Sequence, residues 1–263
     1  ACGFATAGKG IVIPGLDGAL PDLAFVRTVA RGSFEQVTHR LGILHALAAT
    51  GVAVVNDARV IERCVDKSTA TFLFQKAGLP VPPTRVAEGI AAARKFAAEM
   101  GPSLVTKPLF GSQGNGVARV DSLDDLPPPE AVGEVYYLQR YLRSPADTRF
   151  EDYRVFVSKG RILSAMIRVG SSWITNVHQG AKPMAMRDMD EETIALALGA
   201  AKAIGADYAG VDLIRDQSGR QMVLEINSNP AWKGLQSVTD LDIGETIASD
   251  FLDALGLTAG ARP

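Results

Sequence analysis

Three residues near the C-terminal end of the 263-residue chain carry side-chain oxygen atoms that suit a metal ion: Asp212, Glu225 and Asn227. Glu225 and Asn227 are two positions apart, so in a β-strand both side chains leave the same face. The intervening DQSG predicts a turn. A tight turn there pairs Asp212 with Val223 and brings all three side chains to one face, where their oxygen atoms suit Mg2+. The alternative is an ordinary hairpin whose acids face solvent.

A glycine-rich segment, GSQGNG at 111–116, follows a strand-like run that ends at Lys107. Glycine adopts backbone conformations that expose N–H groups cheaply, and such concave segments attract phosphate oxygens. No Gly-Lys-Ser/Thr follows, so this is not a Walker A loop. The segment predicts a phosphate-binding loop with Lys107 as a nearby point charge, and a plain structural hairpin is the alternative.

Hydrophobic periodicity predicts the elements that must position these residues. Helical patterns lie in four segments: FEQVTHRLGILHALAATG, DKSTATFLFQKAGLP, IAAARKFAAEMG and DEETIALALGAAKAIG. The first lies between strand-like DLAFVR and VAVVN, which indicates a strand–helix–strand unit. A hairpin turning at Lys159 and Gly160 is predicted for YRVFVSKGRILSAMIRVG. The segment SLDDLPPPEAVGE is interpreted as a flexible link.

The composition is typical of a folded cytoplasmic chain. Hydrophobic residues make up 47% of it, which is ample for a buried core, and the net charge of -2 favours neither nucleic acid nor a membrane surface as partner. Cys2 and Cys64 form no disulfide framework. No apolar run approaches membrane-spanning length, and the first residues lack a signal core. The histidines, His39, His45 and His178, are too scattered for zinc.

The order of sequence blocks resembles the ATP-grasp superfamily and, within it, the RimK-like α-L-glutamate ligases. The matching blocks run from Asn56 to Asp250 and are CVDKSTATFLFQKAGLPVPPT, VTKPLFGSQGNGV, YLQRYL, EDYRVFV, ITNVHQGA, GVDLIRD and VLEINSNP. The resemblance implies an ATP-grasp fold that mixes α/β and α+β parts. It implies an N-terminal Rossmann-like lobe at 1–65, a central lobe with the glycine-rich lid at 66–139 and a C-terminal lobe with the metal site at 140–263.

The resemblance also implies roles for individual residues. ATP is expected to contact two lysines, the lid, a hinge strand and an aspartate near ribose: Lys67, Lys107, Gly111, Ser112, Gln113, Gly114, Gly116, Gln139, Arg140, Tyr141, Leu142 and Asp152. The expected catalytic residues, which lie near the transferred phosphate, are Arg154, Arg168 and Asn176. The expected metal ligands are Asp212, Glu225 and Asn227, which hold two Mg2+ ions, with Mn2+ as a substitute.

Three features depart from the family pattern. Arg140 occupies a hinge position that is often acidic, which a backbone contact to adenine tolerates. Gln179 stands where the family's N-x-H-R-G-G block has arginine, so Arg168 or Lys182 must compensate or activity is lowered. The segment before Asn56 is short and begins at Ala1 without a methionine, which suggests a truncated N-terminal lobe.

The implied activity is an ATP-dependent carboxylate–amine ligase that forms an amide bond through an acyl phosphate. The run AWKGLQSVT is closest to relatives acting on one-carbon cofactors. The expected partners are L-glutamate and a small carboxylated cofactor of the tetrahydromethanopterin or methylofuran type, or a protein or peptide acceptor, with homo-oligomerisation left open. The alternatives are another ATP-grasp ligase, of the peptide-forming, lysine-pathway or D-alanine type, and a nucleotide-binding regulatory protein without catalysis.

Overall fold

The computed structural model describes residues 2–6, 8–111, 114–142 and 150–256. Its N-terminal part contains a short hairpin, a pair of parallel strands and two helices: β1 (Gly3–Phe4), β2 (Ile11–Val12), β3 (Leu23–Phe25), α1 (Phe34–Ala49), β4 (Ala53–Val55) and α2 (Ala58–Val65). The strand–helix–strand unit expected from the sequence is β3–α1–β4. Ser33 caps α1 together with Gln36 in a capping box, which fixes where the helix begins.

The middle of the chain builds a four-stranded antiparallel sheet, here called the central sheet, in the order β5-β8-β6-β7. Its elements, with the helix that precedes them, are α3 (Lys67–Lys76), β5 (Thr84–Glu88), α4 (Ile90–Met100), β6 (Leu104–Lys107), β7 (Ala118–Val120), η1 (Leu123–Asp125), η2 (Pro129–Val132) and β8 (Val135–Arg140). The segment expected to be a flexible link instead forms the two 3-10 turns η1 and η2, because Val132 and Leu126 pack into the core under α4.

The C-terminal part builds a five-stranded antiparallel sheet, here called the C-terminal sheet, in the order β11-β10-β9-β12-β13. Its elements are β9 (Phe150–Ser158), β10 (Arg161–Gly170), η3 (Val177–Gln179), β11 (Lys182–Ala185), α5 (Glu191–Ile204), β12 (Tyr208–Arg215), β13 (Gln221–Asn227), α6 (Lys233–Gln236) and α7 (Ile243–Ala254). The predicted β9–β10 hairpin is confirmed. Lys159 and Gly160 both have positive φ, as a tight two-residue hairpin turn requires.

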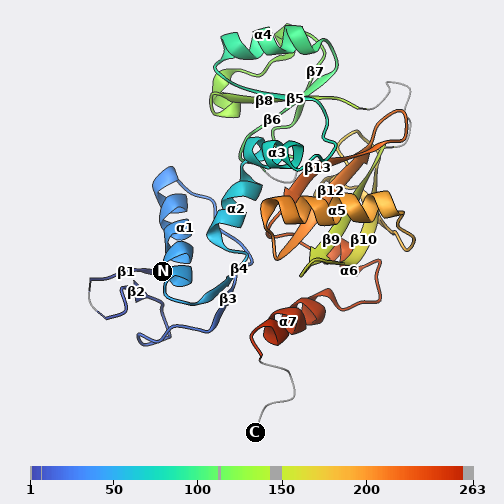
Figure 1. The fold of residues 1–263 in the computed structure, drawn as a ribbon. Coiled ribbons are helices and arrows are strands. Elements are labelled where there is room, and N and C mark those ends of the chain that lie inside the picture. Colours follow the sequence, from blue (N-terminus) through green and yellow to red (C-terminus); the bar gives the residue numbers. More distant parts are fainter. Residues whose placement is uncertain (1, 7, 112–113, 143–149, 257–263) are drawn as a thin grey trace.

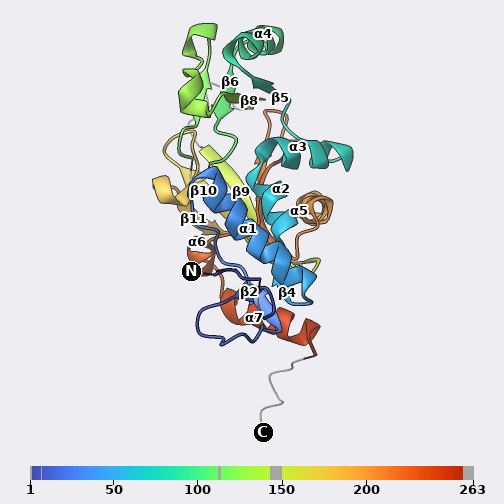
Figure 2. The same cartoon turned by 90° about the vertical axis from the view of Figure 1, so that its left-hand side faces the viewer.

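The C-terminal sheet is covered on both faces. Apolar side chains of α2, α3 and α5 pack on one face, where the buried residues include Phe74 and Ile204. On the other face, Phe156 and Tyr208 pack against α6 and α7 and against Phe25 of β3. In both views the central sheet with α4 lies at one end of the molecule and α7 at the other (Figures 1 and 2). The C-terminal sheet is therefore the rigid platform of the molecule.

One buried side chain joins the N-terminal strands to this platform. Asn56 is fully buried and donates to the carbonyls of Tyr208 and Ser228, at 2.8 and 2.7 Å, while its own oxygen accepts from the amide of Asp207. All its polar atoms are thus satisfied within the protein. Of the helices in the described ranges, none has the length and apolar character needed to cross a membrane.

Candidate functional site

A pocket of about 150 Å³ opens where the central and C-terminal sheets face each other. Most of the residues singled out from the sequence line it: Lys67, Lys107, Gly111, Gly114, Gln139, Arg140, Tyr141, Leu142, Asp152, Arg154, Arg168, Asn176, Asp212, Glu225 and Asn227. Gly116 is not among the lining residues, and Ser112 and Gln113 lie outside the described residues. The folded chain therefore gathers lysines, arginines, carboxylates and amides, separated by up to 160 positions, into one cavity.

The β12–β13 hairpin differs in register from the sequence expectation. Asp212 pairs with Glu225, not with Val223, which pairs with Leu213. The ladder shifts at this point, so Leu224 is the extra residue of a β-bulge. Without the bulge, Asp212 would pair with Leu224 and Glu225 would face the opposite side. The bulge thus places Asp212 and Glu225 on the shared face expected from the sequence, although the register differs from the one that a tight turn predicts.

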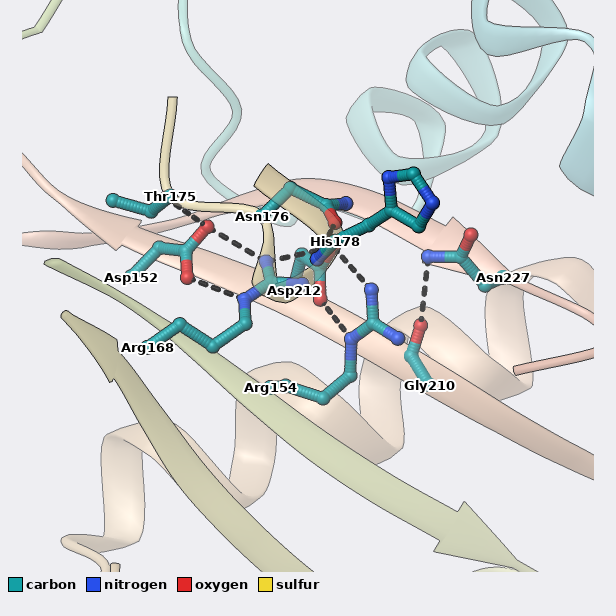
Figure 3. Close-up of polar contacts among 9 residues, drawn as sticks. All are labelled: Asp152, Arg154, Arg168, Thr175, Asn176, His178, Gly210, Asp212 and Asn227. Carbon is teal, nitrogen blue, oxygen red and sulfur yellow. Dashed lines mark hydrogen bonds and ion pairs between the residues drawn. The ribbon is translucent and has the colours of Figure 1, made fainter. Parts of the chain in front are cut away.

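Asp212 is held by two arginines from neighbouring strands (Figure 3). Arg154 binds both of its carboxylate oxygens, with Nη2 at 2.7 Å from Oδ2, and Nη2 of Arg168 lies 3.1 Å from the same oxygen. The Asp212 side chain is only 7% exposed. Burial acts to raise its pKa, but the charges of Arg154 and Arg168 outweigh burial and leave the pKa below its ordinary value. Asp212 is therefore an ionised, fully paired carboxylate in this structure.

A second buried pair lies beside the first. Arg168 donates from Nε and Nη2 to the two oxygens of Asp152, each at 2.6 Å, and Thr175 donates its hydroxyl to Asp152 at 2.6 Å. Burial raises the pKa of Asp152, and the coulombic effect of Arg168 opposes this shift. Thr175 was not singled out from the sequence. Its position next to Asn176, in a block already singled out, is the signal that could have found it.

The oxygen-bearing residues fit a magnesium ion in type and placement. Asp212 pairs with Glu225 and Gly210 with Asn227, so the three side chains lie along one face of one hairpin. Asn227 donates its Nδ2 to the Gly210 carbonyl at 3.5 Å, which leaves the amide oxygen on the other side (Figure 3). No group of three or more His, Cys, Asp or Glu side chains suited to a metal occurs in the described ranges. Two carboxylates and an amide still suit Mg2+, which usually keeps waters and phosphate oxygens as further ligands.

The two lysines of the pocket are bonded differently from the arginines. Nζ of Lys107 donates to Oε1 of Gln139 at 2.8 Å, and Nζ of Lys67 donates to the Gly111 carbonyl at 2.8 Å. Among the residues with described positions, neither forms a salt bridge. Burial lowers the pKa of Lys107 to about 8, with nearby Glu225 opposing the shift, and burial also lowers the pKa of Lys67. In the described part of the chain these ammonium groups have no anion at contact distance, and a phosphate would supply one.

The glycine-rich loop packs against both sides of the pocket. Gly114 has φ +73°, and a Cβ there would lie 2.7 Å from Nε2 of Gln179 and 2.9 Å from Ile174. Gly116 has φ +72°, and a Cβ there would lie 2.6 Å from Cγ of Pro108. Both positions therefore require glycine on two counts, backbone conformation and space. The residue that replaces the family's arginine, Gln179, lies against this loop.

The strand expected to be the hinge is β8, and Arg140 stands at its end, where the family often has an acidic residue. Arg140 donates to the carbonyls of Met100 and Pro102, where α4 ends. A cation at a helix C-terminus is favourable because the last carbonyls lack partners within the helix. The Gln139 side chain is buried and bonded to Lys107, Thr84 and Tyr137. The side chains of Arg140 and Gln139 are thus engaged within the protein.

A family model described as the RimK-like ATP-grasp domain matches residues 64–251. The tetrahydromethanopterin:alpha-L-glutamate ligase of Methanococcus maripaludis is 33% identical, over 88% of this chain and 78% of that protein. The enzyme of the same name from Methanosarcina acetivorans is 30% identical, over 86% and 78%. The alpha-aminoadipate--LysW ligase LysX of Saccharolobus solfataricus is 29% identical, over 80% and 79%.

Solved structures share the fold. The ATP-grasp ligase PsnB in complex with minimal precursor, Mg and ADP aligns with a TM-score of 0.70 at 21% identity, covering 97% of this chain and 85% of that one. A RimK domain ATP-grasp protein from Sphaerobacter thermophilus aligns with a TM-score of 0.65 at 21% identity, covering 92% and 83%. The ATP-grasp fold predicted from the sequence is confirmed, and the chain belongs to the RimK-like family of ATP-grasp ligases.

Proposed function

We propose that this protein is an ATP-dependent ligase that joins the amine of L-glutamate to a carboxylate of a small cofactor of the tetrahydromethanopterin type. Two relatives that are 33% and 30% identical to this chain are named tetrahydromethanopterin:alpha-L-glutamate ligase, and they support this substrate pair. The observation that carries the proposal is the single pocket in which Lys67, Lys107, Arg154, Arg168 and the Asp212 hairpin meet. This combination suits the transfer of a phosphoryl group to a carboxylate.

In this proposal the nucleotide lies between the two sheets. The backbone of 139–142 contacts adenine, Asp152 lies on the ribose side, and Lys67, Lys107 and the glycine-rich loop contact the phosphates. Lys107 and Lys67 are bonded only to neutral groups in the described part of the chain, so phosphate oxygens would give their charges a partner. This gain favours nucleotide binding because each buried ammonium group then forms charge-assisted hydrogen bonds.

Asp212, Glu225 and Asn227 would hold two Mg2+ ions, for which Mn2+ can substitute. When bound, the ions neutralise phosphate charge and stabilise the oxygens that enter and leave. Arg154 binds both oxygens of Asp212 and lines the pocket, so it would hold this metal ligand in position.

The chemistry has two steps. An oxygen of the cofactor carboxylate forms a bond to the γ-phosphorus, and the bond from that phosphorus to the β-γ bridging oxygen breaks, which gives an acyl phosphate and ADP. The glutamate amine then attacks the acyl carbon, loses a proton, and expels phosphate to leave the amide. Arg154, Arg168 and Asn176 supply hydrogen-bond donors where negative charge develops. The walls of the pocket exclude water, which would otherwise hydrolyse the acyl phosphate.

The proposal requires that ADP release depend on both substrates. ADP formation by the purified protein is measured with ATP and Mg2+, glutamate present or absent, against a panel of carboxylated cofactors and peptides. Turnover that needs glutamate and one cofactor supports the proposal. Turnover with a different amine, or with a peptide acceptor alone, identifies another ligase of the family and contradicts it.

ATP as co-substrate and two free cysteines suit a cytoplasmic enzyme.

A further inference from the structure

An arginine outside the pocket has no carboxylate partner among the residues that the structure describes. Arg27, just after β3, places its guanidinium carbon 3.8 Å from the ring centroid of Trp232 and 5.8 Å from that of Phe25. Its Nη2 donates a long hydrogen bond, 3.4 Å, to the Pro230 carbonyl, and the guanidinium also interacts with the hydroxyl of Tyr208. The side chain is exposed. The guanidinium is therefore held over an indole ring in an exposed position, where it can still donate to an anion.

The backbone beside Arg27 is fixed to the C-terminal part of the chain. The Val26 carbonyl accepts from the hydroxyl of Tyr208 at 2.7 Å and from Nδ2 of Asn229 at 3.2 Å. Trp232 in turn packs edge-on against Phe156 of β9, with ring centroids 6.0 Å apart. These contacts hold the arginine and the indole in place, so the position of the charge is set by the folded structure and not by a free side chain.

Arg27 is linked to the pocket residue Arg154 through Pro230 and Gly210. A Cβ at Gly210 would lie 2.9 Å from Cβ of Pro230 and 3.1 Å from Cδ of Arg154. Arg154 therefore packs beside Pro230 across this glycine, and Arg27 binds the carbonyl of the same proline. Arg154 lines the pocket and Arg27 does not. Arg27 thus lies outside the pocket, and its contact with Pro230 connects it to Arg154.

We propose that Arg27, seated on Trp232, binds a non-reacting carboxylate of the amino-acid substrate. A guanidinium presents paired donors that match the two oxygens of a carboxylate. Glutamate keeps both of its carboxylates when its amine is acylated, so one of them is free to lie on Arg27 while the amine reaches the acyl phosphate. This inference rests on the proposed glutamate ligase activity and names a residue that recognises one of its substrates.

The test compares glutamate with its two monoamides, glutamine and the α-amide, as amine substrates. In the wild type, the amide that lacks the Arg27-bound carboxylate is used poorly. In Arg27→Met, the preference for glutamate over that amide falls by roughly tenfold or more, since hydrogen bonds to charged groups contribute to that extent. The ratio does not depend on the fraction of folded enzyme, so reduced stability cannot imitate the effect. Arg59→Met, which removes an exposed arginine of α2, is the matched control. It should keep the wild-type preference for glutamate over each of the two amides.

Binding without turnover separates this inference from the proposed function. In Trp173→Phe, Trp232 is the one remaining tryptophan. Its fluorescence is expected to change with glutamate or with glutarate as a probe, and Arg27→Met is expected to abolish the change. Unaltered amide ratios in Arg27→Met, or glutamate binding that Arg27→Met leaves intact, would overturn the role of Arg27 and leave the ligase activity standing. Absence of glutamate-dependent turnover in the wild type would instead overturn the proposed function.

Discussion

The two sheets that face each other across the pocket hold their positive charges in opposite ways. In the central sheet, Lys107 donates to a neutral amide, and burial lowers its pKa to about 8. In the C-terminal sheet, Arg154 is bound to the buried carboxylate of Asp212, and Arg168 is bound to those of Asp152 and Asp212. One wall therefore carries a buried charge without an anionic partner among the described residues, and the other carries a neutralised network.

Because of this difference, substitutions on the two walls of the pocket should have different effects on ligand binding and on stability. Removing an unpaired buried cation takes away a ligand contact but also relieves a desolvation cost, so the fold should tolerate it. Removing one member of a buried ion pair leaves an uncompensated charge and destabilises the fold strongly. Substitutions on the central wall should therefore weaken nucleotide binding, whereas substitutions on the C-terminal wall should weaken both activity and stability.

The largest effect is expected for Asp212→Asn. Losing a metal ligand should lower ADP formation by roughly 100-fold or more, which corresponds to several kcal/mol of transition-state stabilisation. It also leaves Arg154 and Arg168 without a shared carboxylate, which should lower the free energy of unfolding by about 3–5 kcal/mol. Glu225→Gln should lose activity to a similar degree with little change in Tm, because Glu225 forms no salt bridge with any residue in the described ranges. Turnover kept by both variants would contradict the metal assignment.

Lys107→Met should show the difference between the two walls most clearly, because it should weaken ATP binding without lowering stability. The Kd for ATP should rise by roughly 10-fold or more, because a charge-assisted hydrogen bond to phosphate is lost. Tm without ligand should stay the same or rise, because the variant buries no charge. Thermal shift with and without ATP measures both quantities. A variant that loses stability while keeping its full nucleotide-induced shift would show that Lys107 has a structural role instead.

The pH dependence of ATP binding should report the same lysine. The pKa of Lys107 in the free protein is about 8, below the ordinary 10.5, and bound phosphate favours the charged form. Above pH 8 the free protein must therefore take up a proton to bind ATP, so affinity should fall as pH rises, by up to about tenfold per pH unit. Calorimetry between pH 7 and 9.5 tests this. Lys107→Met should show a flatter profile, with Lys67 responsible for any residual slope.

The smallest effect is expected for Thr175, which supports the ion pairs of the C-terminal wall. Thr175→Val removes a hydrogen bond to Asp152 without changing the shape of the side chain, and should lower the free energy of unfolding by about 1 kcal/mol. Thr175→Ser keeps the hydroxyl and should restore stability. Equal Tm values for the valine and serine variants would show that the hydroxyl does not support the Asp152–Arg168 pair.

The sequence predicted the fold family because the blocks around Lys67, Lys107 and the Asp212 hairpin are local patterns in a fixed order. It could not predict the register of that hairpin, because a β-bulge at Leu224 depends on pairing across two strands. It also missed α2 and β11, which are short and stabilised by tertiary packing. The partners of Arg154, Arg140 and Thr175 lie far along the chain, so their roles in ion pairs and caps became visible only in the structure.

The mass of the product tests the central claim most directly. The purified protein is incubated with ATP, Mg2+, glutamate and a tetrahydromethanopterin-type cofactor, and the cofactor is analysed by mass spectrometry, with Glu225→Gln as the inactive control. The account predicts a cofactor heavier by one or more glutamyl units, formed only when ATP is present and not by the control variant. An unmodified cofactor, in a preparation that binds ATP tightly, would contradict it.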